Sequence, residues 1–173
     1  QYHGAGQPHN VARSVWQAVF FALFAAIAVL GFVPLAEPTF RAAGHAPEVQ
    51  HQEVIYFRIL VAGGGLAILS SALSAFFTGL GKTRTVMWAN LAATLVNVVL
   101  DYALIFGHFG LPRWGIKGAA IATVAASASG MLILLALFLN REHRRTYGTL
   151  KSFGFDAEIF RRLMRYGAPS GVQ

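Results

Sequence analysis

Residues 85–107 read TVMWANLAATLVNVVLDYALIFG and contain a single charged residue, Asp101. A helix of this length spans about 35 Å at 1.5 Å per residue, which exceeds the roughly 30 Å hydrocarbon core of a bilayer. A backbone in lipid must satisfy its own hydrogen bonds, as an α-helix does. The stretch therefore predicts a transmembrane helix with one acid inside it.

Three other apolar blocks are long enough to cross a bilayer, at residues 14–36, 54–78 and 115–139. Together the four segments predict an all-α fold, a polytopic transmembrane helical bundle. Residues 140–165 read as a basic loop, and residues 166–173 resemble the start of another transmembrane helix. Since the chain begins with Gln rather than Met and ends inside that segment, we expect it to be part of a longer protein.

The charge composition favours a membrane environment over nucleic-acid binding. Only 12% of the residues are charged, against about 25% in soluble domains. The net charge of +7 comes from Lys and Arg between the apolar blocks, as expected for loops facing anionic lipid. We therefore expect an integral, multi-pass protein of the cell (inner or plasma) membrane, which contacts the lipid bilayer and no nucleic acid.

The distribution of Lys and Arg predicts which loops face the cytoplasm. Residues 1–13, 79–85 and 140–165 together hold ten of the 14 basic residues. The loops at the other ends of the predicted helices hold three basic residues, and Arg58 lies near the same ends. We expect the first set of loops to be cytoplasmic, so that the helix at residues 14–36 runs outward.

Asp101 lies about 24 Å along its helix from Thr85, in the outer half of the membrane. An unpaired carboxylate there costs several kcal/mol, so its side chain is expected to face a cavity, a partner or a proton. At 100° per residue, its helix carries one polar stripe about 60° wide. The stripe consists of Asn90, Thr94, Asn97 and Asp101.

The stripe predicts a lined cavity in which Asn97 and Asp101, one turn apart, share one cation or proton. Thr123 and Ser127 lie on one face of the 115–139 helix and are expected to contribute to the cavity. The alternative for such residues is interhelical hydrogen bonding, which lets membrane helices approach closely. That alternative is favoured for Ser129, Ser127 and the polar residues of the 54–78 helix, which are Ser71, Ser74 and Thr78. For Thr123 the sequence favours neither the cavity role nor interhelical hydrogen bonding.

No other pattern predicts a chemical site. The six histidines are expected in solvated loops, and no pair has the i, i+4 spacing of a metal site. Gly63, Gly64 and Gly65 lie inside a span and indicate close helix packing or local flexibility. We expect no enzyme activity, no cofactor and no resident metal, apart from Na⁺ at Asp101 and Asn97 if Na⁺ is the coupling ion.

Five segments resemble, in the same order, segments of the multidrug and toxic compound extrusion (MATE) family. In that family the first segment follows helix 2 and the second comprises the end of helix 4 and the cytoplasmic turn after it. The third forms helix 5, the fourth begins helix 6, and the fifth begins helix 7. In this chain they are Gln1–Gly6, Phe76–Arg84, residues 95–107, Gly115–Thr123 and Leu163–Pro169.

The resemblance implies a twelve-helix, two-lobe transporter, of which this chain would hold helices 3–6 of the N-lobe. Residues 1–13 would be the end of helix 2 with its loop, and residues 140–165 the loop between the lobes. An Asn and an Asp on helix 5 of the family help to form a cation or proton site, and Asn97 and Asp101 match them. Thr123 matches a helix-6 Thr that contributes in some members. The missing helices of the same protein would then be partners of this chain.

These features favour multidrug efflux by H⁺- or Na⁺-coupled antiport of cationic amphipathic compounds through alternating access. A lipid-linked oligosaccharide flippase of the same superfamily is one alternative. It is expected to have a strongly cationic cavity, but no Lys or Arg lies well inside a predicted span. The other alternative is a non-transporting structural membrane protein, in which Asp101 would be paired within the bundle.

Overall fold

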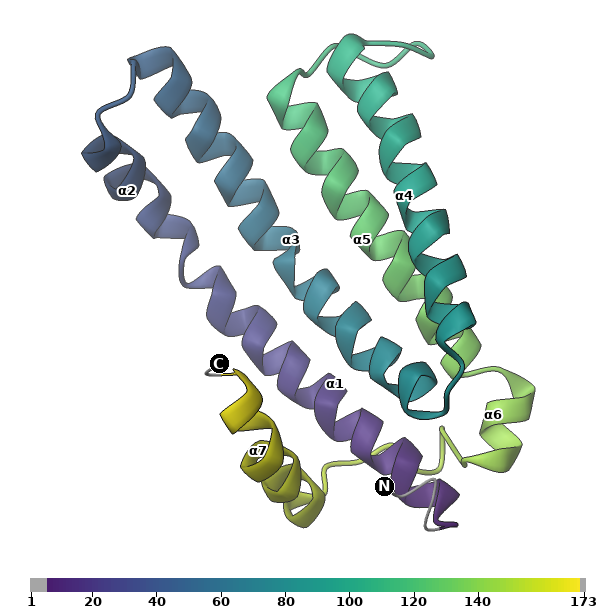
Figure 1. Cartoon of the computed structure of the whole chain (residues 1–173). Helices are drawn as coiled ribbons and strands as arrows, with labels where there is room; N and C mark the ends of the chain where they lie inside the picture. The colour runs from purple at the N-terminus through teal and green to yellow at the C-terminus, as the bar shows by residue number, and fades with distance from the viewer. Residues whose placement is uncertain (1–5, 172–173) are drawn as a thin grey trace.

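The computed structural model describes residues 6–171, and the side-chain surroundings of residues 6–167. Within this range the chain is all-helical, as predicted, and its long helices run up and down side by side (Figure 1). The elements are α1 (Pro8–Leu30), the short 3-10 helix η1 (Val33–Leu35), α2 (Ala36–Ala43), α3 (Pro47–Gly79), α4 (Thr83–Phe106), α5 (Ile116–Phe138), α6 (Arg141–Thr146) and α7 (Ala157–Gly171).

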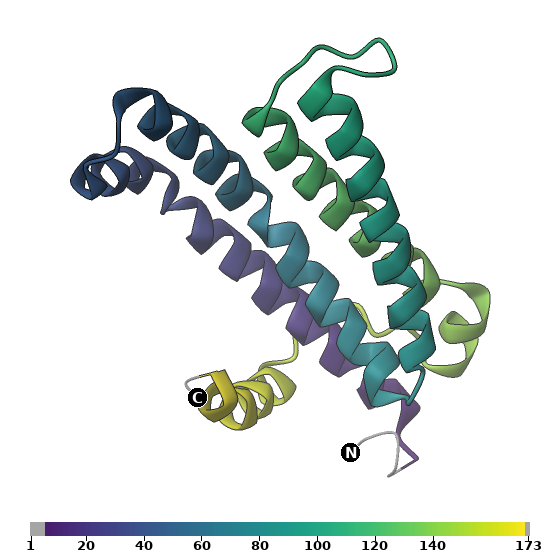
Figure 2. The same ribbon diagram turned by 45° about the horizontal axis from the view of Figure 1, so that its top comes forward.

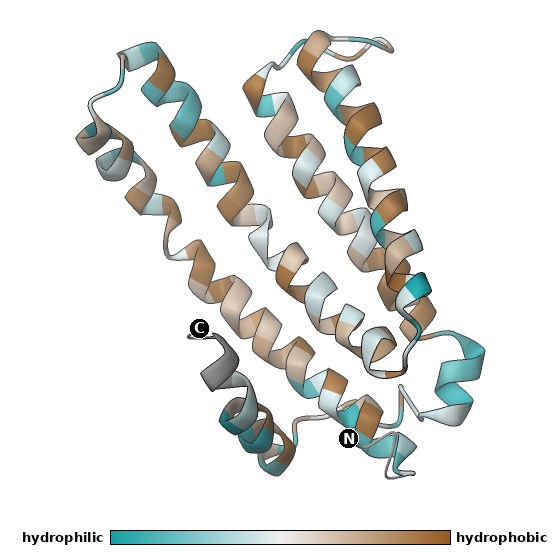
Figure 3. Ribbon diagram, viewed as in Figure 1, coloured by the Kyte–Doolittle hydropathy of each residue, from teal (hydrophilic) through white to brown (hydrophobic). Residues whose placement is uncertain are grey.

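Four helical segments of the described chain are long and apolar enough to cross a membrane, namely Pro8–Ala42, Pro47–Gly79, Thr83–Phe106 and Ile116–Phe138. Their outward surfaces are apolar, and brown hydrophobic bands recur along all of them in Figure 3. Phe24 and Ile27 of α1, for example, expose 71% and 70% of their surface. A continuous apolar surface of this kind is costly in water and is the normal exterior of a helix in lipid.

The order of the helices in space differs from their order in the chain. α3 packs between α1 and α5, and α4 packs mainly on α5 rather than on α3. Figure 2 shows α4 diverging from α3 above the short turn that joins them. Residues of α3, α4 and α5 line a groove between these helices.

Two glycines let α3 pack tightly on both sides. A Cβ atom on Gly63 would lie 2.3 Å from Cγ2 of Val124 in α5, and one on Gly65 would lie 2.4 Å from Cβ of Ala26 in α1. Positions two residues apart on a helix point to nearly opposite faces. The glycine run therefore serves close helix packing, as the sequence suggested.

Helix α1 begins earlier and ends earlier than predicted, and this corrects the boundaries 14–36. Pro8 stands in the first turn, where its missing N–H costs nothing, so the helix includes residues 8–13 of the predicted loop 1–13. Pro34 has no N–H to donate to the carbonyl of Leu30, which ends the helix there. Residues 1–5, which carry most of the first segment resembling the MATE family, lie outside the described part.

Residues 37–53, which separate the predicted spans 14–36 and 54–78, are also largely helical. Gly44 has a φ of 72°, which ends α2, and Pro47 then begins α3 seven residues before the predicted boundary at 54. With 33 residues, α3 is about 50 Å long and exceeds the bilayer core, so its polar first turns extend beyond it. Arg58 binds Glu37 at 2.8 Å and holds α2 against α3. The other two spans agree with their predicted boundaries 85–107 and 115–139 to within two residues.

The predicted loop 140–165 contains one helix and most of another. Asn140 caps α6 by accepting a hydrogen bond from the backbone N–H of His143, at 2.8 Å. Asp156 accepts hydrogen bonds from the N–H groups of Glu158 and Ile159, both at 3.1 Å, and so begins α7. The helix expected to start near residue 166 is thus the continuation of α7 from Ala157, while residues 172–173 lie outside the described part.

The chain after α6 is attached to α1 by two buried side chains. The indole N–H of Trp16 donates to the carbonyl of Thr149 at 2.6 Å. The amide of Gln17, which is fully buried, donates to the carbonyl of Gly154 at 2.8 Å and accepts from the N–H of Asp156 at 3.0 Å. These bonds fix the path of the 147–156 segment across the end of the bundle where α1 begins (Figure 1).

His143 is part of the core rather than a solvated loop residue, which corrects the expectation for this histidine. It is 4% exposed and packs against Phe76 and Phe77 of α3, with ring centroids 5.2 and 5.7 Å apart. Its Nδ1 lies 2.7 Å from the carbonyl of Leu137, and its Nε2 lies 3.2 Å from Nζ of Lys82. Sequence spacing alone does not reveal this burial, because α6 is only six residues long.

Changing Gly65 to Ala is expected to destabilise the protein by about 1–3 kcal/mol, because the new methyl group overlaps Ala26. The measurement is thermal unfolding of the full-length gene product in detergent. Gly79→Ala is the matched control in the same helix, since no atom lies within 4 Å of its Cβ position. Equal melting temperatures for the two variants would contradict the packing role of Gly65.

Changing Gln17 to Leu is expected to loosen the 147–156 segment, because the carbonyl of Gly154 and the N–H of Asp156 lose their partner at about 1–3 kcal/mol each. Trypsin cleavage after Lys151, followed by mass spectrometry, measures the effect. Gln52→Leu, at an exposed position of α3, is the control. Cleavage at the same rate in both variants would show that Gln17 does not hold the segment.

Candidate functional site

A polar groove with a volume of about 380 Å³ lies between α3, α4 and α5. We call it the polar groove and define it by the residues that line it, which are Ala67, Ser70, Asn90, Ala93, Thr94, Asn97, Thr123, Ala126, Ser127 and Gly130. Ala and Gly make up four of the ten lining residues and leave the space open, while residues with amide or hydroxyl groups make up the other six.

Five of the six residues predicted for the site line this groove. α4 contributes Asn90, Thr94 and Asn97, and α5 contributes Thr123 and Ser127. The opposite face of α4 is apolar and open to the exterior, with Leu95 and Val99 59% and 56% exposed. The helical periodicity therefore separates an acceptor-rich inner face from a lipid-compatible outer face.

Three of the four hydroxyl groups that line the groove donate hydrogen bonds within their own helices. Thr94 donates to the carbonyl of Asn90 at 2.9 Å, Thr123 to that of Ala119 at 3.0 Å, and Ser127 to that of Thr123 at 3.0 Å. Each hydroxyl oxygen keeps lone pairs that accept hydrogen bonds or coordinate a cation. None of the residues that line the groove is a Lys or an Arg. The groove thus offers oxygen acceptors and no fixed positive charge, which suits a cation better than an anion.

Asp101 is not among the residues that line the groove, although it lies on α4 one helical turn beyond Asn97. Its residue is half-buried, and its Oδ1 atom is buried without a hydrogen-bond partner in the part of the chain that the structure describes. A buried carboxylate oxygen without a partner is costly in lipid. The structural alternative requires a partner for Asp101 within the bundle, and the described helices supply none for its Oδ1 atom.

The sequence interpretation missed the contribution of α3. Ser70 and Ala67 line the groove, whereas the predicted polar face of that helix was Ser71, Ser74 and Thr78. Thr78 instead donates to the carbonyl of Ser74 at 2.9 Å, within α3. Ser70 and Ser71 are adjacent in the chain, so only the packing of α3 against α5 decides which of the two faces the groove.

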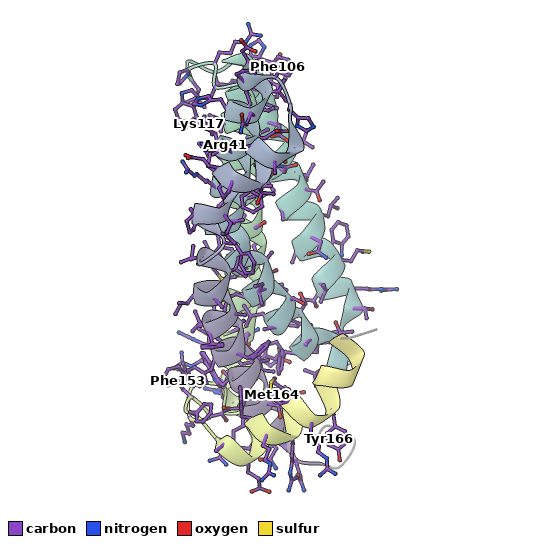
Figure 4. The ribbon with its side chains drawn as sticks, turned by 90° about the vertical axis from the view of Figure 1, so that its left-hand side faces the viewer. Arg41, Phe106, Lys117, Phe153, Met164 and Tyr166 are labelled. Atoms are coloured by element: carbon purple, nitrogen blue, oxygen red, sulfur yellow. The ribbon has the colours of Figure 1, made fainter. Side chains whose placement is uncertain are left out.

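The two sets of loops that the count of Lys and Arg separates lie at opposite ends of the bundle (Figure 1), and the assignment of one end to the cytoplasm stays a prediction. Arg41 and Lys117 lie near one end of the molecule in Figure 4, while Phe153, Met164 and Tyr166 lie near the other. The ammonium group of Lys117 lies 5.5 Å from the ring centre of Trp114, a cation–π distance at the end of the bundle where α4 leads into α5.

Comparison with known proteins places this arrangement in a family. The sequence model of the MatE family matches residues 1–103, more than half of the chain. The chain is 28% identical over 171 residues to the "Probable multidrug resistance protein NorM" of Thermotoga maritima, covering 98% of this chain and 36% of that protein. It is 31% identical over 173 residues to the protein of the same name in Rhizobium meliloti, covering 99% and 37%.

A solved structure has the same fold. It is described as the inward-facing conformation of a multidrug resistance MATE family transporter of the MOP superfamily, with a TM-score of 0.83 and 24% identity. The match covers 98% of this chain and 38% of the solved one. The chain therefore spans little more than a third of the length of these relatives. With a family model matching over half of its residues and four membrane-length helices, the chain is a multi-pass membrane protein and belongs to the MATE family.

Proposed function

We propose that the protein containing this chain exports cationic amphipathic compounds in exchange for H⁺ or Na⁺, and that this chain supplies the ion site of one lobe. The observation that carries the proposal is the polar groove, which offers amide and hydroxyl acceptors and no cation, with the unpartnered Oδ1 of Asp101 one turn away. The names of the relatives as probable multidrug resistance proteins support the export of drugs, and the cationic, amphipathic class of compound is part of the proposal.

Asp101 and Asn97 are the proposed coupling residues, with Thr123 as a further ligand. In the ion-free state the carboxylate of Asp101 carries a charge that these helices leave uncompensated. Binding of H⁺ or Na⁺ neutralises that charge and removes the cost of burying it against apolar neighbours. The ion therefore binds better to the conformation in which Asp101 is buried, which is the condition for driving a conformational change.

Asn90, Thr94 and Ser127 are proposed to line the path of the exported compound. A cationic substrate exchanges its water for the acceptors of these three residues, and the small side chains Ala67, Ala93, Ala126 and Gly130 leave room for an apolar ring. Alternating access would then expose the groove to one side of the membrane at a time. The missing two thirds of the relatives' length would provide the opposing wall.

Changing Asp101 to Asn is expected to reduce ion-coupled efflux by about ten-fold or more, because the amide neither binds a proton nor neutralises a cation. The measurement is efflux of ethidium, a cationic dye, from cells that express the full-length gene product, with an imposed H⁺ or Na⁺ gradient. Glu48→Gln, an equivalent change at an exposed position of α3, is the control. Unchanged efflux and unchanged ion dependence in Asp101→Asn would make Asp101 structural.

Cysteine labelling tests whether the groove holds water. The chain has no cysteine of its own, so once any cysteine elsewhere in the full-length gene product is replaced, a single introduced cysteine reports on a single site. Asn97→Cys is expected to react with a water-soluble methanethiosulfonate reagent at least about ten-fold faster than Leu95→Cys, because thiols need water to ionise. Leu95 is 59% exposed but lies on the apolar outer face of α4. Similar rates at both positions would show that the groove is not an aqueous path.

A further inference from the structure

A second site candidate lies at the opposite end of the bundle from Lys117, beside α6. It is a pocket with a volume of about 630 Å³. We call it the basic pocket and define it by its lining, which is Arg141, Arg144, Arg145, Gly148, Leu150 and Lys151. Four of the six residues are cations, and none is an acid.

The fold holds these cations in place through the buried face of α6. His143 is 4% exposed and is fixed by the carbonyl of Leu137 and the ammonium group of Lys82. Residues three and four apart share a helix face, so Arg141, Arg144 and Arg145 gather on the side away from His143. The segment after α6 brings Lys151 to the same pocket, and the bond from Trp16 to Thr149 fixes the course of that segment.

The four cations are not neutralised by the protein in the range 6–167. The described ion pairs there involve Arg13, His45, Arg58, Lys82 and Arg162, and none includes a residue of the basic pocket. The nearest acid in sequence, Glu142, is 3.9 Å from Lys82 instead. Four like charges around one cavity repel one another, and an anion of matching size relieves that repulsion.

Apolar side chains beside the pocket show where it lies relative to the membrane. Leu150 lines the pocket and is 46% exposed, and Phe153 is 62% exposed. The ring of Phe153 packs on Trp16 and Phe20 of α1, a predicted span, with ring centroids 4.7 and 5.6 Å apart. Figure 4 places Phe153 at this end of the bundle. The pocket therefore lies at the level where a spanning helix meets the membrane surface.

We propose that the basic pocket binds the headgroup of an anionic phospholipid in the leaflet that the Lys and Arg count assigns to the cytoplasm. Arginine pairs with phosphate oxygens through two parallel N–H donors, and three arginines with one lysine surround the headgroup. Leu150 and Phe153 lie against the first methylenes of its acyl chains. A soluble phosphate offers the same charge but nothing for these apolar side chains, which is why the structure favours a lipid.

The experiment compares two triple variants of the full-length gene product that lose the same charge. Arg141, Arg144 and Arg145 are changed to Gln in the first, and Arg84, Arg161 and Arg165 in the second. Both sets lie on the predicted cytoplasmic side, so any effect on topology or general electrostatics is shared. Binding of phosphatidylglycerol and of phosphatidylcholine to the protein in detergent is measured by native mass spectrometry across a lipid titration.

We expect phosphatidylglycerol binding to weaken about ten-fold or more in the pocket variant and less than about two-fold in the control, with phosphatidylcholine unchanged in both. Equal losses in the two variants would overturn the proposal, because they indicate unspecific charge attraction. Competition by glycerol 3-phosphate as strong as that by the lipid would overturn it as well, since it indicates a site for a soluble anion.

A third variant, Leu150→Asp, keeps all four cations and places an acid in the pocket lining. It is expected to weaken phosphatidylglycerol binding to a similar extent, with the melting temperature of the unliganded protein unchanged. This variant tests the site even if the triple Arg variant fails to fold. Wild-type lipid binding in Leu150→Asp would contradict the assigned position of the headgroup.

Discussion

The hydrocarbon core of a bilayer offers no hydrogen-bond partners, and the arrangement of this chain follows from that constraint. Each backbone amide in a span bonds within its own helix, and polar side chains survive there where they face other helices. The polar groove collects such side chains from α3, α4 and α5, while Leu95 and Val99 turn outward. Asp101 is the exception, with one carboxylate oxygen buried and unpaired in the described chain.

Close packing of α3 on α1 and α5 sets the geometry of the polar groove, which lies one helical turn from Asp101. Gly63 and Gly65 bring α5 and α1 close to its two sides, so α4 is left in contact mainly with α5. The groove opens where α4 diverges from α3. Residues at the other end of the bundle, including Trp16, Gln17 and His143, tie the short helices and the following segment to the spans. The bundle thus has close packing at the end that holds Trp16, Gln17 and His143, and a polar groove between α3, α4 and α5. Both are consistent with the proposed transport role.

Much of the fold was predictable because lipid imposes a length and a period that a sequence displays directly. The four spans and the polar stripe of α4 follow from runs of apolar residues and from the 100° helical step. The boundaries of α1 were wrong because apolarity marks the membrane, whereas Pro8 and Pro34 mark the helix. Helix α6 and the first part of α7, before residue 166, were missed because capping by Asn140 and Asp156 is a local event within a polar, basic segment.

By itself, the sequence determined the class of the molecule, the number and approximate position of its spans, and the polar face of α4. It did so because each of these depends on one helix and its solvent. Only the tertiary structure decided that Ser70 rather than Ser71 faces the groove, that Asp101 lies beyond its lining, and that His143 is buried. Each of these depends on where a neighbouring helix lies, and the packing of α3 between α1 and α5 sets that position.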